Sequence, residues 1–207
     1  MTTQLGFFFD SSKCTGCKTC QVACKDKKMS PATVSFRRVY EYSGGNWYAD
    51  SDNTWSQDVF AYYMSIACNH CADPACVKAC PTTAMYKRAE DGLVVVNEDI
   101  CIGCRYCEWA CPYGAPQYDP VKKYMTKCDG CLDQLALGLQ PICVRACPLR
   151  ALDFGPIDEL RAKYGDKADI APLPPSNITQ PSLVVKGART ARPSEDKAGQ
   201  IRNRKEV

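Results

Sequence analysis

The chain has 207 residues, a formal net charge of +3, and 16 cysteines beside a single histidine. This length suits one or two small domains, and no apolar run is long enough to cross a bilayer. The basic residues form no single stripe and accompany no recognised nucleic-acid motif, so nucleic-acid binding is disfavoured. A signal peptide, a phosphate loop and a dinucleotide fingerprint are also missing, which leaves no constellation that could activate a substrate.

β-branched and aromatic residues concentrate in three segments that each lie just before a cysteine-containing loop. These segments are predicted strands, at 6–10, 60–67 and 93–97. The stretch 26–57 is predicted to be an inserted hairpin, with turn signals at Gly44-Gly45 and Asp52-Asn53.

The last third of the sequence starts with a predicted helix at 156–164. Pro156 would occupy its first position, acidic residues its first turn, and Gly165 would follow its end. From residue 171 the composition shifts to Pro, Ser, Arg and Lys with little periodicity. This tail is predicted to lack a core and to be either disordered or laid along a partner.

The cysteines form four groups of four, and none is left over. Groups one to four are Cys14, Cys17, Cys20 and Cys24; Cys68, Cys71, Cys76 and Cys80; Cys101, Cys104, Cys107 and Cys111; and Cys128, Cys131, Cys143 and Cys147. Three cysteines at two-residue intervals can surround a cubane cluster, and a fourth after three more residues ligates the other cluster of a two-cluster unit. The spacing therefore predicts four [4Fe–4S] clusters, which together would form an electron-transfer chain.

Other uses of cysteine fit the pattern less well. A zinc ribbon usually shows two separate CxxC pairs, although zinc is the main alternative, and a disulfide scaffold would show irregular spacing and a signal peptide. A Rieske centre needs two histidines, and a plant-type [2Fe–2S] site needs a CxxxxCxxC run, which is absent. His70 is the only histidine, and we expect it to be a loop residue near sulfide rather than a ligand.

Cluster ligation would change the charge balance of the protein. Deprotonated ligands and four cluster cores would turn the formal +3 into about −5. Basic residues beside the groups are expected to offset this charge and tune potential, although a solvated surface role is equally open for any one of them. They are Lys13, Lys18, Lys25, Arg105, Lys127 and Arg145.

The ends of the four groups repeat one another. In each, the third and fourth cysteines lie four residues apart, which predicts one face of a short helix between two clusters. A proline that follows groups two, three and four would end that helix, whereas Lys25 takes its place in group one.

Strand, cluster loop and short helix, repeated, predict an α+β fold with two ferredoxin-like, two-cluster domains, loop insertions and an extended C-terminal tail. The first domain would combine 1–57 with 120–165 and carry groups one and four. The second, 58–119, would carry groups two and three, and 166–207 would be the extended, partner-bound tail.

The sequence stretches around and between the cysteines closely resemble those of the iron–sulfur subunits of bacterial dimethyl sulfoxide reductases. These belong to the larger group of four-cluster subunits of molybdopterin oxidoreductases. The matching words are Cys14-Thr-Gly-Cys-Lys-Thr-Cys, Val34-Ser-Phe-Arg-Arg, Cys101-Ile-Gly-Cys-Arg-Tyr-Cys, Ala110-Cys-Pro-Tyr-Gly-Ala-Pro-Gln-Tyr, Met125-Thr-Lys-Cys-Asp-Gly-Cys, Cys147-Pro-Leu-Arg-Ala-Leu-Asp-Phe-Gly-Pro and Ala171-Pro-Leu-Pro. The cysteine runs alone indicate only the broad group.

The resemblance implies that ligands cross over between groups. Cluster one would be held by Cys14, Cys17, Cys20 and Cys147, and cluster two by Cys24, Cys128, Cys131 and Cys143. Cluster three would be held by Cys68, Cys71, Cys76 and Cys111, and cluster four by Cys80, Cys101, Cys104 and Cys107. Nitrate reductase relatives carry tryptophan at the position of Cys104 and a three-iron cluster there, an alternative that Cys104 disfavours.

The resemblance also implies partners. They would be a molybdopterin catalytic subunit that reduces dimethyl sulfoxide or related S- and N-oxides, and a membrane anchor that oxidises menaquinol in anaerobic respiration. The chain itself would be non-catalytic and peripheral to the bacterial cytoplasmic membrane, with the side left open. Arg37-Arg38 is not a twin-arginine signal, because no suitable apolar stretch follows it.

Three rival functions stay open at this stage. One is the same electron-transfer role in a thiosulfate, polysulfide or selenate reductase or a formate dehydrogenase, since substrate choice belongs to the catalytic subunit. Another is a free polyferredoxin, and the third is a structural zinc module that mediates assembly.

Overall fold

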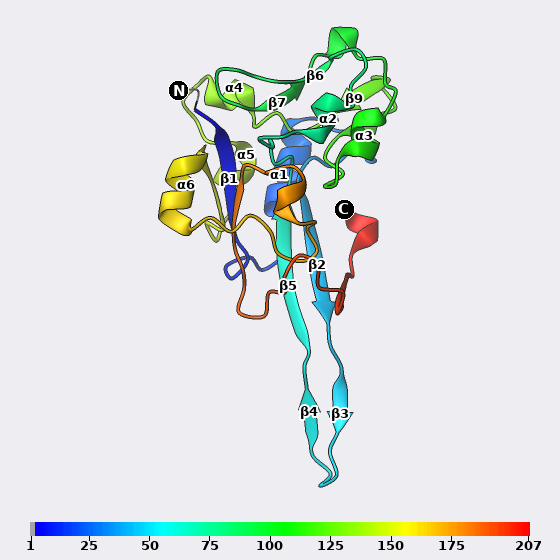
Figure 1. Ribbon diagram of the computed structural model, residues 1–207, viewed down its shortest axis with the longest axis vertical. Coiled ribbons are helices and arrows are strands. Elements are labelled where there is room, and N and C mark those ends of the chain that lie inside the picture. Colours follow the sequence, from blue (N-terminus) through cyan, green and yellow to red (C-terminus); the bar gives the residue numbers. More distant parts are fainter. Residues whose placement is uncertain (1–2) are drawn as a thin grey trace.

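The computed structural model describes residues 3–207 as short helices and strands joined by loops (Figure 1). The α-helices are α1 (Thr19–Lys27), α2 (Ala75–Lys78), α3 (Tyr106–Ala110), α4 (Leu132–Leu135), α5 (Ile142–Arg145) and α6 (Ile157–Tyr164). The strands are β1 (Leu5–Asp10), β2 (Arg38–Gly44), β3 (Trp47–Ala49), β4 (Trp55–Gln57), β5 (Phe60–Ile66), β6 (Met85–Lys87), β7 (Val94–Val96), β8 (Gln117–Asp119), β9 (Tyr124–Thr126), β10 (Leu152–Pro156), β11 (Leu183–Lys186) and β12 (Gly199–Ile201). The mixture confirms the predicted α+β class.

The central sheet has the order β10-β1-β11, with β1 antiparallel to β10 and parallel to β11. β1 carries three consecutive phenylalanines that are all buried, as expected for a strand covered on both faces. Phe8 stacks on Tyr164 of α6, with ring centroids 3.6 Å apart, while Phe7 and Phe9 belong to the main core. The predicted strand and the predicted helix that ends before Gly165 are therefore present, but Pro156 ends β10 and precedes the helix instead of occupying its first position.

The second sheet, β12-β2-β5, extends into the β3–β4 pair, which projects from the body as a long arm (Figure 1). The predicted hairpin is present, and Asn53 at its tip has a φ of 64°. The turn predicted at Gly44-Gly45 is wrong, because Gly44 pairs with Phe60 and the backbone continues outward into β3. The returning strand is β5, so the hairpin links a strand of the first predicted domain to one of the second.

The short helices pack in the pairs that the cysteine grouping predicts. α1 of group one packs on α5 of group four, and α2 of group two packs on α3 of group three. The fourth cysteine lies inside the helix only in α1. The helices of the other three groups end before it, so a shared helix face was the wrong expectation there. The difference follows the proline, because α1 has Lys25 at that position and continues to Lys27.

The segment after residue 165 packs on the rest of the protein, which corrects the expectation of a tail without a core. Ile170, Leu173 and Leu183 are buried in the main core. β11 adds a parallel strand to β1, and β12 adds an antiparallel strand to β2. Apolar residues without a regular period are sufficient to anchor this segment, because each one packs against a surface that other segments provide.

Candidate iron–sulfur sites

The cysteine loops have backbone conformations that turn N–H groups toward the sulfur atoms. Left-handed φ values occur at Gly16 and Lys18 in group one, and at Gly103 and Arg105 in group three. Alternation of this kind produces concave arrays of N–H groups that bind anions. A Cβ on Gly16 would lie 2.3 Å from the Tyr63 ring, so glycine is required there for space as well as for its φ of +71°.

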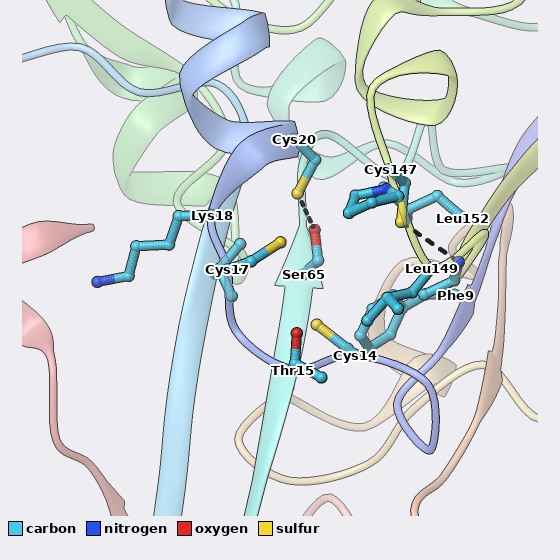
Figure 2. Close-up of a pocket in the computed structure, with 13 residues that line it drawn as sticks. Phe9, Cys14, Thr15, Cys17, Lys18, Cys20, Ser65, Cys147, Leu149 and Leu152 are labelled. Carbon is cyan, nitrogen blue, oxygen red and sulfur yellow. Dashed lines mark hydrogen bonds between the residues drawn. The ribbon is translucent and has the colours of Figure 1, made fainter.

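Cys14, Cys17 and Cys20 line one cavity together with Cys147, which comes from the other end of the cysteine region (Figure 2). The Sγ of Cys20 lies 3.4 Å from the hydroxyl of Ser65, and the Sγ of Cys147 accepts from the Ala151 N–H at 3.3 Å. The quartet that the resemblance implies for cluster one is thus assembled around a single space.

A second cavity is lined by Cys80, Cys101, Cys104 and Cys107, the quartet implied for cluster four. Backbone N–H groups approach its sulfur atoms. The Met85 N–H donates to Cys80 at 3.4 Å and the Met125 N–H to Cys101 at 3.5 Å.

Six of the remaining eight cysteines are buried, and Cys71 and Cys111 are half-buried. Burial, followed by the charges of Cys143 and Cys131, raises the pKa of Cys24 to about 12. Burial likewise raises the pKa of Cys71 to about 12, with further contributions from Cys68 and Cys111. These mutual influences follow the quartets implied for clusters two and three, because each thiol is raised by members of its own set.

Cys128 joins the two inner quartets. Burial is the largest cause that raises its pKa well above the ordinary value, and the charge of Cys24 comes next. Cys68, which belongs to the other inner set, also contributes. Neighbouring quartets are thus connected in the order one, two, three, four. α1 packs on α5, Cys68 and Cys128 lie in the same core cluster, and α2 packs on α3.

Two cysteines of the outer quartets, Cys17 and Cys80, differ from the others because their pKa values are lowered. A hydrogen bond from the Thr19 hydroxyl, with Oγ1 3.4 Å from Sγ, is the largest cause that lowers the pKa of Cys17. At Cys80 burial raises the pKa, but hydrogen bonds from the Met85 N–H and from Thr82 outweigh it.

Thiols that burial keeps protonated become ligands when a metal centre displaces their protons, and sulfur donors of this kind suit iron–sulfur clusters. The donor sets and the inward-facing N–H groups therefore fit [4Fe–4S] clusters.

Most of the basic residues predicted to offset cluster charge interact with groups other than the cysteines. Lys25 donates to the carbonyls of Pro31, Ala32 and Val34, and Lys18 pairs with Glu206. Arg105 pairs with Glu108, and Arg145 donates to Gln134.

Lys127 is buried, in contrast, and donates to the carbonyls of Val94 and Cys128. Its charge also lowers the pKa of Cys76, against the larger effect of burial. Of the predicted set, Lys127 is thus the one that lies within the cysteine core.

Two buried arginines were not predicted to belong to the site. Arg37 and Arg38 occur in a stretch that resembles the family and do not form a targeting signal, and both side chains lie inside the molecule. The Arg38 Nη2 donates to the Tyr113 carbonyl at 2.7 Å, beside Cys111. Their position within the apolar and aromatic stretch 34–42 is the signal that could have predicted their burial.

His70 is fully buried, and its Nδ1 accepts from the Val94 N–H at 3.0 Å. Burial, and then the charges of Lys127 and Lys87, lower the pKa of His70 well below its usual range. The imidazole is therefore neutral, with Nδ1 engaged by the backbone, in keeping with a loop residue.

Among residues 3–207, no helix combines the length and the apolar character needed to cross a membrane.

Comparison with known proteins gives consistent results over the whole sequence. A family model described as a 4Fe-4S dicluster domain matches residues 59–157, and one described as a 4Fe-4S binding domain matches residues 5–26. The protein is 64% identical over 207 residues to the B subunit of anaerobic dimethyl sulfoxide reductase of Escherichia coli (strain K12), with 100% of each sequence covered. It is 65% identical over 204 residues to the same subunit of Haemophilus influenzae, with 99% of each covered. The B subunit of polysulfide reductase of Wolinella succinogenes is 39% identical over 164 residues, and the match covers 79% of this protein and 82% of that one.

Proposed function

The protein belongs to the family of anaerobic dimethyl sulfoxide reductase B subunits, which are iron–sulfur electron-transfer subunits, and from that premise we propose a specific path for its electrons. They enter from a membrane anchor subunit that oxidises menaquinol and leave to a molybdopterin catalytic subunit that reduces dimethyl sulfoxide or a related oxide. The chain itself activates no substrate and is held at the cytoplasmic membrane by its partners.

The proposed ligands are the four quartets that the resemblance implies, and each bound [4Fe–4S] cluster supplies one-electron chemistry. The observation that carries the proposal is that neighbouring quartets are in contact, through α1 and α5, through the core around Cys68 and Cys128, and through α2 and α3. The two outer quartets line cavities that include Cys17, which is exposed, and Cys104, which is half-buried, whereas all four cysteines of quartet two are buried. Electrons can therefore enter at one end and leave at the other.

We further propose that cluster four is the entry point and cluster one the exit. Large apolar side chains are exposed on and beside the group-three loop that would hold cluster four, including Ile102, Tyr106 and Trp109. A partner that contacts the membrane would cover such a surface. The family resemblance assigns the group-one end to the catalytic subunit.

Metal analysis and a two-donor assay test this function. Protein purified anaerobically with its partners should contain about sixteen iron and sixteen acid-labile sulfide atoms per chain, the product of four clusters and four atoms of each. Colourless protein rich in zinc would refute the cluster assignment, and a lone brown protein that never co-purifies with a large subunit would favour a free polyferredoxin.

The Cys104→Ser complex decides the polarity. It should lose quinol-driven turnover but keep reduction of substrate by a small artificial donor that acts on the catalytic subunit. Equal loss of both activities would contradict the proposed direction.

A related substrate is the second candidate, because the B subunit of polysulfide reductase matches most of this protein. Turnover of the purified complex with polysulfide in place of dimethyl sulfoxide separates the two.

A further inference from the structure

Arg37 is a buried cation at the junction of two cysteine quartets. It lies just before β2 and is only 2% exposed. Its guanidinium carbon lies 4.7 Å from the centroid of the Phe7 ring, and its Nη1 donates to the carbonyl and hydroxyl oxygens of Ser65 at 3.4 and 3.3 Å. Packing on both sides therefore fixes the position of the charge.

This position connects Arg37 to cysteines that belong to different quartets. Through its side chain it contacts Ser65, whose hydroxyl lies 3.4 Å from the Sγ of Cys20, as the line between these two residues in Figure 2 shows. Its backbone N–H also acts on Cys24, where it lowers the pKa of the thiol against the larger effect of burial. Cys20 and Cys24 lie one turn apart on α1 and are the proposed ligands of clusters one and two.

Two nitrogen donors of the Arg37 guanidinium are unpaired among the residues that the structure describes. Within residues 3–207, Nε and Nη2 have no hydrogen-bond partner although both are buried, and no carboxylate forms an ion pair with Arg37. A buried charge with unsatisfied donors is strongly unfavourable unless an anionic group faces it.

The groups that act on the guanidinium charge are cysteines. Burial lowers the pKa of Arg37, but the negative charge that these cysteines carry once deprotonated outweighs it and leaves the pKa raised. The contributing residues are Cys143, Cys20, Cys128 and Cys24. Three of these four belong to the proposed quartet of cluster two, and one to that of cluster one.

We propose that Arg37 is a fixed positive charge shared by clusters one and two, that its free Nε and Nη2 donors bind their sulfur atoms, and that it raises the reduction potential of both. The proposal rests on the ligand sets proposed above. Reduction adds an electron to an already anionic site, so a nearby cation stabilises the reduced form, and burial strengthens the effect. Cluster two should respond more strongly, because three of its proposed ligands, against one of cluster one, act on the charge of Arg37.

The test is a redox titration of the assembled complex followed by electron spin resonance. Arg37→Gln should lower the midpoint potential of cluster two by at least about 59 mV, which is a tenfold change in the equilibrium of a one-electron couple. Cluster one should shift less in the same direction, and clusters three and four should be unchanged. Arg37→Lys retains the charge but loses the forked donors, so its cluster-two potential should fall between those of the unaltered and Gln forms.

Arg145→Gln is the matched control, because it removes the same charge from an exposed position on α5, inside group four. It should leave all four potentials unchanged. Wild-type potentials in both Arg37 variants, or an equal shift of all four clusters, would overturn the proposal.

A variant that does not assemble and a complex without cluster signals are interpreted separately. If Arg37→Gln does not assemble, the Arg37→Lys titration alone decides, and an unshifted cluster two refutes the proposed donor role. If the unaltered complex lacks [4Fe–4S] signals, the proposed function fails first. Normal signals with unresponsive Arg37 variants contradict only this inference.

Discussion

Replacing Ile170 by alanine should destabilise the protein, although Ile170 lies in the segment 166–207 that the sequence predicts to be an extended tail. The side chain is 0% exposed and belongs to the main core. The substitution removes three buried carbons, worth about 2.4 kcal/mol at roughly 0.8 kcal/mol each. The cavity left behind places the total within the range of about 2–5 kcal/mol found for such truncations.

The assay is the thermal midpoint of the purified, cluster-loaded protein under anaerobic conditions, read from circular dichroism and from the visible absorbance of the clusters. For a protein of this size, 1 kcal/mol corresponds to roughly 2–4 °C, so the expected fall is at least about 5–10 °C. Cluster loss makes unfolding irreversible, so variants are compared at one scan rate.

Ile178→Ala is the matched control, because Ile178 lies in the same segment but is 53% exposed. It should change stability by no more than about 0.5 kcal/mol, or roughly 2 °C. If the two variants were equally stable, the packing of this segment on the body would be refuted, and the sequence-based expectation of a partner-bound tail would regain support.

Three further predictions concern the clusters. Gly16→Ala should abolish the cluster-one resonance signal because its Cβ would clash with Tyr63, whereas Gly138→Ala, with a similar φ of +70° and open space around it, should leave all signals intact. Cys104→Ser should convert cluster four into a three-iron species of higher potential, since three thiolates keep the other corners, and unchanged spectra of the oxidised protein would mean that Cys104 is not a ligand. Removing iron with a chelator should largely unfold the protein, because so much of its core consists of cysteines, and retention of the far-ultraviolet circular dichroism of the loaded protein would contradict this.

Local sequence determined the cluster loops and the elements beside them. The interval between cysteines sets how the backbone must turn around a cluster, and Gly16 and Gly103 supply the conformations that these turns require. The three phenylalanines of β1 specify a strand buried on both faces, and Gly165 marks the end of α6. Such features depend on neighbours within a few residues, so they can be predicted from the sequence.

Residues far apart in the sequence could be joined only by the tertiary structure. The spacing predicts only that the last cysteine of a group serves another cluster, and the complete quartet with Cys147 was expected from resemblance until the structure assembled it around one cavity. β11 finds its place because β1 offers an open edge, and Ile170 is buried because the main core has room for it. Arg37 reads as a surface charge in the sequence, yet packing closes over it between two quartets. Burial and pairing are properties of the assembled surfaces, which is why local pattern did not predict them.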